Sequence, residues 1–308
     1  MRTPRNQRTK ADYLIVGGGM AGISALAEAR RLGISTICLE ADKKPGGRVR
    51  TVRNRRFANH PIELGAEFVH GLAMKQLCES LRLTLIKHPS DGSAYVDKES
   101  LPLLPILYKF KSIRERAAAH LAAGKEDRSV EEFVASLEHE DLPSGVTSHL
   151  LRQLIRNDFA SRISDLSLTG LLAPDVDGYE DNYRIAEGYD EVPRRLAALG
   201  GGNDVRINHV VSAIRRHRDG VDVVTNRGVY SGNVAVVCLP VGVLQAGDVQ
   251  FDPPLALAKS VALDSINAGA ATKLIMCFRR GRRRTAFWPP TMPLLATSLA
   301  TQLWWPTS

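Results

Sequence analysis

Residues 12–22, with the sequence DYLIVGGGMAG, decide the fold of this chain. The apolar run that ends at Val16 predicts a buried strand, and the glycines after it predict a tight turn. The alanine-rich segment from Met20 to Leu32 predicts a helix, which Gly33 ends. A second apolar run at 34–39 predicts another buried strand. These segments together predict a complete β-α-β unit.

The glycine turn matches the G-x-G-x-x-G pattern of dinucleotide-binding folds, with Met20 and Ala21 inside the pattern. Gly17 permits the turn out of the strand, Gly19 lets a pyrophosphate approach the backbone, and Gly22 lets the helix lie close to the sheet. The free N–H groups and the positive dipole end of the helix then face the phosphates.

Glu40 stands at the end of the second predicted strand. An acidic residue at this position accepts hydrogen bonds from ribose hydroxyls, and its negative charge disfavours a 2′-phosphate. The alternative is a glycine turn in some other α/β protein, but the strand, helix and acidic residue all stand where the fingerprint requires them. We therefore predict a site for the adenosine and pyrophosphate of a dinucleotide, formed by Gly17, Gly19, Met20, Ala21, Gly22 and Glu40.

Two later stretches are GGRVRT at 46–51 and ELGAEFVHG at 63–71. Both resemble motifs of the flavin-dependent amine oxidase superfamily, which includes monoamine, polyamine and spermine oxidases. Residues 46–51, GGRVRT, resemble its G-G-R-x-x-T motif, although a solvated basic loop is the alternative for this stretch alone. Residues 63–71, ELGAEFVHG, resemble its E-L-G-A-x-W-x-x-G stretch, with Phe68 in place of the tryptophan. The resemblance implies that the cofactor is FAD.

The resemblance also implies roles for residues of both stretches. Gly47 and Arg48 are expected to contact FAD, and the second stretch is expected to pass beneath the flavin ring with Leu64, Gly65, Ala66 and Glu67. His70 matches a histidine that faces the substrate cavity in animal polyamine and spermine oxidases. Without the resemblance, a hydrogen-bonded loop histidine explains His70 equally well.

Four further segments resemble family motifs and follow in the family's order, at 183–189, 208–211, 237–244 and 251–254. They imply a return to the FAD-binding domain, with Val211 on the strand whose backbone holds the adenine. Glu187 stands where the family usually has the first of two glycines. In the same region we expect a helix at 190–199 and strands at 204–207, 210–216, 221–225 and 234–239.

The segments between these motifs predict helices at 75–83, 102–123, 129–139 and 146–160. The predicted fold class is therefore α/β, with a discontinuous Rossmann-like FAD-binding domain and an inserted α+β substrate-binding domain. We expect the FAD-binding domain at 11–88 and 187–258, and the substrate domain at 89–186 and 259–308.

Residues 271–278, ATKLIMCF, are apolar apart from Lys273 and predict a strand. Burial would lower the pKa of this lysine if it faces inward. Its match in the family holds a water against flavin N5, which implies a catalytic role for Lys273. The alternative is a lysine at a strand edge that reaches the solvent.

The resemblance implies FAD-dependent oxidation of a polyamine or monoamine by hydride transfer to flavin N5, giving an imine and then an aldehyde, with hydrogen peroxide from O2. Lys273 and His70 are the predicted catalytic residues, and no metal site is predicted. Two other hypotheses stay open: a non-catalytic FAD-binding remnant, and a flavoprotein like phytoene desaturase or protoporphyrinogen oxidase. Family members continue beyond the lysine strand, so we expect a C-terminally truncated copy.

Composition bounds the partners and the compartment. The formal net charge is +8, but the sequence shows no aromatic interleaving or recognition helix, so no nucleic-acid partner is expected. The four cysteines lack metal or redox spacing, which favours a reducing compartment. No signal peptide or membrane segment is recognisable in the sequence, so we expect a cytoplasmic protein. The expected partners are a small-molecule amine and O2.

Overall fold

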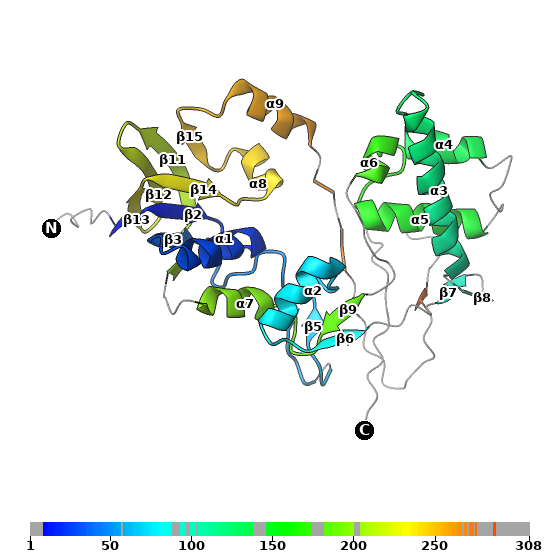
Figure 1. Ribbon diagram of the computed structural model, residues 1–308, viewed down its shortest axis with the longest axis horizontal. Coiled ribbons are helices and arrows are strands. Elements are labelled where there is room, and N and C mark those ends of the chain that lie inside the picture. Colours follow the sequence, from blue (N-terminus) through cyan, green and yellow to red (C-terminus); the bar gives the residue numbers. More distant parts are fainter. Residues whose placement is uncertain are drawn as a thin grey trace. The chain divides into compact units, whose positions relative to one another are not determined.

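A computed structural model describes residues 9–56, 58–87, 93–96, 99–102, 104–137, 146–173, 182–199, 204–266, 268–269, 271–273, 275 and 286–287. These residues fall into two compact units (Figure 1). Unit 1 contains the described residues up to Ile86 and those from Arg184 to Ala268. Unit 2 contains the described residues from Lys87 to Tyr183 and those from Gly269 onward. The domain boundaries expected from the sequence remain predictions.

A parallel four-stranded sheet lies at the centre of unit 1. Its order is β10 (Val205–Arg206), β3 (Thr36–Leu39), β2 (Tyr13–Val16) and β14 (Val234–Val237). Helix α1 (Met20–Arg31) connects β2 to β3 and contacts both strands, and α7 (Glu191–Ala198) lies against α1 (Figure 1). The predicted β-α-β unit is therefore confirmed.

The β-α-β unit forms where the sequence is apolar on every side that must be buried. Leu14 and Ile15 of β2 are at most 1% exposed, and Ile23 and Leu26 of α1 are fully buried. A strand covered on both faces needs such a continuous apolar run. Gly33, with φ of +72°, stands just after the helix in the left-handed conformation that ends many helices.

A second sheet of unit 1 has five strands. In spatial order they are β1 (Thr9–Lys10), β13 (Gly228–Gly232), β12 (Gly220–Thr225), β11 (Val211–His217) and β15 (Gln250–Asp252). The three middle strands pair antiparallel, and the two outer ones pair parallel. Val223 and Tyr230 share one buried core with Leu14 and Leu39, so the two sheets are held together by apolar contact. The sequence prediction missed β13 and β15.

The rest of unit 1 is made of short elements. Strands β4 (Thr51–Val52) and β5 (Ile62–Glu63) pair antiparallel. Strand β6 (Leu85–Lys87) pairs with β9 (Tyr183–Ile185) where the chain passes between the units. The helices are α2 (Gly71–Ser80), α8 (Val241–Ala246) and α9 (Leu257–Ser265). Helix α2 starts earlier than the predicted 75–83. The sequence contains no signal for this start, because the N-cap residue is His70, whose side chain makes no cap hydrogen bond.

Unit 2 is mainly helical. Its helices are α3 (Leu104–Ala122), α4 (Val130–Leu137), α5 (Val146–Phe159) and α6 (Leu168–Leu172). Strand β7 (Ser93–Val96) pairs antiparallel with β8 (Glu99–Pro102) and parallel with β16 (Ala286–Phe287). Buried Phe110, Ile113, Phe133, Leu151 and Ile155 belong to one core that joins the helices. The three long helices lie inside their predicted ranges.

The strand predicted at 271–278 is wrong where the structure describes it. Ala271–Lys273 and Ile275 belong to no strand, and the remaining residues of the segment lie outside the described ones. An apolar composition favours a strand, but a strand forms only where a neighbour supplies hydrogen-bond partners. Among the described helices, none is long and apolar enough to cross a membrane.

Candidate functional site

The glycine turn of unit 1 leaves open space beside Gly19, whereas Gly17 and Gly22 are closely packed against backbone atoms. A Cβ added to Gly17, whose φ is +103°, would lie 2.8 Å from the carbonyl oxygen of Cys238. A Cβ on Gly22 would lie 1.9 Å from the carbonyl oxygen of Gly17. A Cβ on Gly19 would meet no atom within 4 Å. The structure therefore leaves open space in front of Gly19, where the sequence predicts the pyrophosphate.

Gly19 is also the N-cap residue of α1, and no side chain caps the helix there. The first N–H groups of a helix lack partners within the helix, and their dipoles attract an anion. A phosphate at this end would satisfy the unpaired donors without displacing a side chain. The turn therefore fits the pyrophosphate of a dinucleotide.

Glu40 is held in place by two backbone donors. Its Oε2 accepts a hydrogen bond from Gly18 N at 2.7 Å, and its Oε1 accepts one from Asp42 N at 2.7 Å. A carboxylate offers roughly four acceptor positions, so about two remain for ribose hydroxyls. Both of these partners are backbone groups, which fixes the carboxylate beside the glycine turn. Glu40 therefore has the orientation and the free capacity that its predicted role requires.

The loop at Gly46–Arg48 lies directly on the glycine turn. Gly46 N donates to Gly18 O at 2.8 Å, and a Cβ on Gly47 would lie 3.2 Å from Gly19 Cα. Gly47 has φ of +58°, which glycine adopts without the strain that a side chain would bring. The Arg48 side chain is exposed. The structure thus brings the glycine turn and the GGRVRT motif together, as the resemblance implied for two motifs that contact one cofactor.

The segment at Leu64–Ala66 lies against the same loop. Leu64 N donates to Arg50 O at 2.7 Å, and Ala66 N donates to Arg48 O at 3.3 Å. A Cβ on Gly65 would lie only 1.8 Å from Arg48 O. This close backbone approach is by itself a reason for glycine at 65. The approach of a flavin ring to Gly65 and Ala66 remains a prediction.

Glu63 connects this segment to the return strand, a role that the sequence did not predict. Its two carboxylate oxygens accept from Thr51 Oγ1 at 2.6 Å and from Tyr189 N at 2.8 Å. Thr51 Oγ1 in turn accepts from Asp190 N at 3.1 Å. Burial raises the pKa of Glu63 above its ordinary value, against the opposing effect of these hydrogen bonds. The half-buried carboxyl therefore links β4, β5 and the segment after β9.

Glu67 forms an ion pair with Arg184 of β9, a partner that the sequence prediction missed. The guanidinium carbon of Arg184 lies 5.0 Å from the centroid of the Phe68 ring. The rings of Phe68 and His70 are 6.0 Å apart between centroids and tilted by 58°. Burial lowers the pKa of Arg184, although Glu67 acts in the opposite direction. The sequence signal that could have indicated this ion pair is the position of Arg184 inside a short apolar segment, where a charge needs a partner.

Glu187, which replaces a usual glycine of the family motif, directs its carboxylate to Thr84. It accepts hydrogen bonds from Thr84 Oγ1 at 2.8 Å and from Thr84 N at 3.1 Å. Gly188 takes the strained backbone position beside it, with φ of +103°. The return segment approaches Thr51 and Arg53 closely at Gly188. Glutamate in place of glycine at position 187 therefore does not prevent this approach.

Val211 begins β11 and is 9% exposed. The segment before it lies against the end of β3, because His209 N donates to Glu40 O at 2.8 Å. The ring of His209 is held at both nitrogens, with Nδ1 2.8 Å from Ile207 O and Nε2 2.8 Å from the Tyr230 hydroxyl. A carbonyl oxygen only accepts, so Nδ1 carries the proton here. Val211 and Glu40 are therefore brought to the same end of unit 1.

The two predicted catalytic residues lie in different units. His70 is exposed and stands at the N-cap of α2 in unit 1. Lys273 is half-buried in unit 2, whereas all the other predicted site residues belong to unit 1. Among the described residues, no group of three or more histidine, cysteine, aspartate or glutamate side chains is arranged to hold a metal ion.

Three cysteines of unit 1 are free thiols in the structure. Burial raises the pKa of Cys38 to about 12 and that of Cys78 to about 11. Burial also raises the pKa of Cys238. Thiols in this state are protonated at neutral pH and react poorly as nucleophiles. None of the three is therefore a candidate for covalent chemistry, and Cys277 lies outside the described residues.

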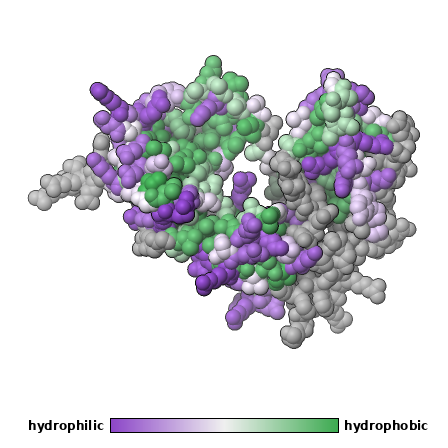
Figure 2. Space-filling view, in the orientation of Figure 1, coloured by the Kyte–Doolittle hydropathy of each residue, from purple (hydrophilic) through white to green (hydrophobic). Residues whose placement is uncertain are grey.

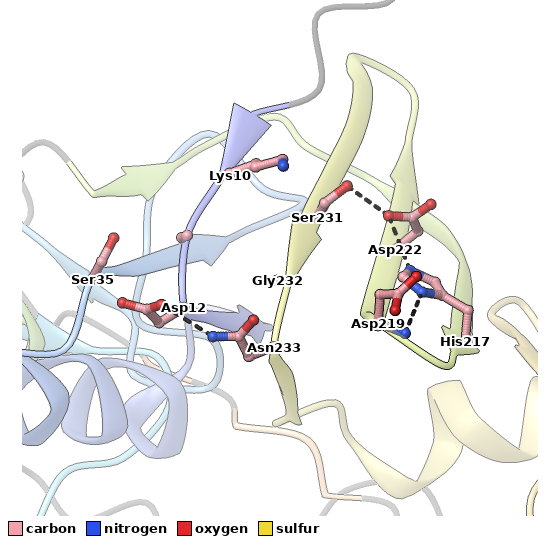
Figure 3. A pocket seen from close by; sticks show the side chains of 10 residues that line it. Lys10, Asp12, Ser35, His217, Asp219, Asp222, Ser231, Gly232 and Asn233 are labelled. Carbon is pink, nitrogen blue, oxygen red and sulfur yellow. Dashed lines mark hydrogen bonds and ion pairs between the residues drawn. The ribbon is translucent and has the colours of Figure 1, made fainter.

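A cavity of about 480 Å³ lies at the other end of the parallel strands (Figure 3). Asp12 and Ser35, which precede β2 and β3, help to line it, whereas the glycine turn follows the carboxyl end of β2. Polar groups around it bind one another, as Asn233 Nδ2 does with Asp12 Oδ1 at 3.1 Å. Ligands of open α/β sheets bind beyond the carboxyl ends of the strands. The glycine turn is therefore the better candidate site.

Comparisons with known proteins show which family and which proteins this chain resembles. The model of the family "Flavin containing amine oxidoreductase" matches residues 20–306. "Polyamine oxidase 3" of Oryza sativa subsp. japonica is 26% identical over 304 residues, which cover 90% of this chain and 60% of that protein. "Lysine-specific histone demethylase 2" of Homo sapiens is 24% identical over 300 residues, covering 89% and 35%.

Solved structures show the same fold. Putrescine oxidase bound to putrescine matches with a TM-score of 0.66 at 18% identity, over 85% of this chain and 65% of that one. Cyclohexylamine oxidase from Brevibacterium oxydans IH-35A matches with a TM-score of 0.66 at 20% identity, over 82% and 63%. The chain spans about 60% of the length of the polyamine oxidases that it matches.

Proposed function

This chain belongs to the flavin-containing amine oxidoreductase family, and from that premise we propose that it binds FAD and oxidises a small amine. One observation supports the proposal most directly. One series of hydrogen bonds, which begins beside the N-terminus of α1, joins the glycine turn to Glu40, to the Gly46–Arg48 loop and, through that loop, to the Leu64–Ala66 segment. This arrangement suits a long, extended dinucleotide.

In the proposed complex, Glu40 binds the ribose of the adenosine half, and Val211 lies beside the adenine. The pyrophosphate occupies the open space at Gly19, next to Met20, Ala21 and Gly22 at the start of α1. The flavin half extends toward Gly47, Arg48 and the Leu64–Glu67 segment. The donors and the free carboxylate capacity described above support this orientation of the cofactor.

The finer fold assignment belongs to the same proposal. Unit 1 would be a discontinuous Rossmann-like FAD-binding domain, and unit 2 an inserted substrate-binding domain. The parallel order β10-β3-β2-β14, with α1 crossing from β2 to β3 after the glycine turn, supports the first part. The separate helical core of unit 2 supports the second.

Bound FAD supplies the hydride acceptor for the α-carbon of the amine, and O2 takes up the two electrons to give hydrogen peroxide. The protein has to bind a neutral amine, orient it and keep competing water away. We assign contact with the substrate to His70, and the holding of a water near the ring to Lys273. The partners in this proposal are the amine and O2, and the cytoplasmic location expected from the sequence stays a prediction.

The relatives favour an amine over the apolar substrates of the alternative hypothesis. The proteins matched include polyamine, putrescine and cyclohexylamine oxidases. Both polyamines and monoamines therefore remain in the proposed substrate class. A direct test is to add FAD to the purified chain, remove oxygen and then add spermine or a monoamine. Loss of the oxidised flavin colour supports the proposal, whereas a chain that stays colourless after FAD addition and gel filtration contradicts it.

Substitution of Lys273 tests the catalytic assignment. Lys273→Met should slow reduction or reoxidation of the flavin while FAD remains bound, since the side chain would act on a water near the ring and not on the adenosine half. Lys125→Met, which removes an exposed lysine of the same unit, is the matched control. Stopped-flow absorbance measures both half-reactions. Unchanged rates in Lys273→Met would remove this lysine from the mechanism.

A further inference from the structure

Arg184 is a buried arginine whose role the proposed function leaves unassigned. Its side chain is 10% exposed, and that of its ion-pair partner Glu67 is 17% exposed. The guanidinium carbon of Arg184 lies over the Phe68 ring, 5.0 Å from its centroid. Ion pair and ring contact together hold Glu67 and Phe68, two consecutive residues, against a strand 117 positions away in the sequence.

Stability alone is a poor explanation for this pair. The Nε atom of Arg184 is buried and has no hydrogen-bond partner among the described residues. A buried donor without a partner is costly, and removal of two charges from water is costly as well. Apolar replacements of a buried ion pair are often neutral or stabilising. A pair of this kind is therefore better suited to holding a particular geometry than to strengthening the fold.

The Leu64–Phe68 segment, which the Arg184–Glu67 pair holds, lies at the end of the proposed cofactor path, the series of segments along which we expect the cofactor to extend. The path starts at Glu40, which binds Gly18 N, and continues where Gly46 N binds Gly18 O. It continues through Arg48 O, which accepts from Ala66 N. The residue after Ala66 is Glu67. A dinucleotide with its ribose at Glu40 and its pyrophosphate at Gly19 would direct its other half along these segments.

We propose that the Arg184–Glu67 pair is a positioning device that fixes the Leu64–Phe68 segment where the flavin half of the cofactor binds. This inference rests on the proposed function, because it presupposes FAD at the glycine turn. The pair acts through the backbone that it anchors, and it lies beyond the part of the path that binds adenosine and pyrophosphate. Its loss should therefore weaken binding of FAD and leave binding of ADP, which lacks the flavin half, unchanged.

The test compares the affinities of ADP and FAD, measured by isothermal titration calorimetry on the full chain. Arg184→Met removes the charge but keeps an apolar chain over Phe68. We expect its FAD affinity to fall about tenfold, the effect of losing roughly one well-placed contact, with ADP affinity within about twofold of the parent. Fluorescence of bound flavin at saturating FAD should rise, because a loosely held ring is quenched less by contact with the protein.

Two further variants separate positioning from folding. The double variant Arg184→Met/Glu67→Gln leaves no unpaired buried charge, so its thermal midpoint should stay close to that of the parent. Its ratio of FAD to ADP affinity should still be low. The matched control is Arg30→Met/Asp204→Asn, which removes another ion pair of unit 1 with an arginine side chain that is also 10% exposed. Arg30 lies in the last turn of α1, and the control should keep the parent's ratio.

The possible outcomes are distinguishable. A low ratio in both Arg184 variants, with a normal ratio in the control, supports the positioning role. Equal weakening of ADP and FAD, or no weakening of either, in variants of a parent that binds both ligands overturns the role and leaves the proposed function intact. A folded parent that binds neither ADP nor FAD overturns the proposed function and this inference together.

Discussion

Gly19 and Gly22 stand three positions apart, at the N-cap and in the first turn of α1, yet each is glycine for a different reason. Nothing lies within 4 Å of a Cβ added to Gly19, whereas a Cβ on Gly22 would lie 1.9 Å from Gly17 O. Gly19 has φ of −69°, which alanine adopts readily. Gly22 is therefore needed for the close packing of α1 on the backbone of Gly17. Gly19 is not needed for packing, and its open side is available to a ligand.

Alanine substitutions separate these two roles. Gly22→Ala should lower the free energy of unfolding by about 1–3 kcal/mol or more, as overpacking does. Gly19→Ala should change it by less than about 0.5 kcal/mol, while its methyl group occupies the proposed pyrophosphate space and weakens ADP binding. Urea unfolding and calorimetry measure the two effects. Equal stability of the two variants would contradict the described geometry of the turn.

The half-buried carboxyl of Glu63 makes the stability of unit 1 depend on pH. Burial raises its folded pKa above the ordinary value of 4.5, so the folded chain holds this proton more tightly than the unfolded chain does. The contribution of Glu63 to stability therefore falls as pH rises from 4.5 through the folded pKa. Glu63→Gln lacks this effect. Its amide can still accept from Tyr189 N and donate to Thr51 Oγ1.

We expect the free energy of unfolding of Glu63→Gln, minus that of the parent, to increase with pH across this window. Glu191 is a useful contrast, because hydrogen bonds from Arg194 lower its pKa. For Glu191→Gln the same difference should decrease as pH rises through the lowered pKa, since the parent gains stability there. Urea unfolding followed by circular dichroism at several pH values measures both slopes. Slopes of the same sign would contradict the assignment.

At the scale of elements, the described helices of unit 2 are joined by one shared apolar core. Ile155 of α5 is fully buried among apolar side chains of α3 and α4. Ile155→Ala should lower the stability of unit 2 by about 2–5 kcal/mol through lost burial and the cavity left behind. Glu115→Ala on the exposed side of α3 is the control, with an expected effect within about 0.5 kcal/mol.

Hydrogen exchange measured by mass spectrometry locates this effect. Amides of α3, α4 and α5 should exchange faster in Ile155→Ala, while those of β2, α1 and β3 keep the parent's rates. ADP affinity should also stay at the parent's value, because the proposed adenosine site lies wholly in unit 1. Faster exchange in both units would show that they unfold together, contrary to the separate cores described here.

At the scale of the whole molecule, unit 1 carries a large apolar surface over α8 and α9 (Figure 2). We call it the α8–α9 surface and define it by Leu257, Val261 and Ile266, which are 80%, 57% and 47% exposed. Neither helix has a buried residue. Contiguous apolar surface of this kind binds hydrophobic dyes and promotes association.

Substitution of the α8–α9 surface should change these properties without changing the fold. Leu257→Glu/Val261→Glu should reduce the fluorescence of the dye ANS and the tendency to self-associate, with stability within about 0.5 kcal/mol per site. Lys259→Glu changes the net charge by the same two units but removes no apolar area, so it is the matched control. Equal dye fluorescence in all three proteins would contradict a role for this surface.

Local signals account for the parts of the fold that the sequence predicted. Gly17, Gly22 and the apolar run before them specify a turn and a buried strand within a few residues of one another. The long helices of unit 2 repeat their apolar positions often enough to be recognised. Helices α8 and α9 were missed because they bury no residue and therefore show no such pattern. Strands β13 (GVYSG) and β15 (QFD) contain no apolar run, and they depend on neighbouring strands that a local pattern does not identify.

The sequence by itself determined the β-α-β unit, the family resemblance and the candidate cofactor residues, because glycine conformation, apolar periodicity and motif order are local properties of the chain. Only the tertiary structure decided that Glu67 pairs with Arg184 and that Glu63 binds Tyr189 N. It also decided that the Arg48 carbonyl oxygen lies too close to Gly65 for a side chain there. The first two contacts join residues more than a hundred positions apart. Their partners are selected by burial and by the need to satisfy buried charges, which exist only once the chain has folded.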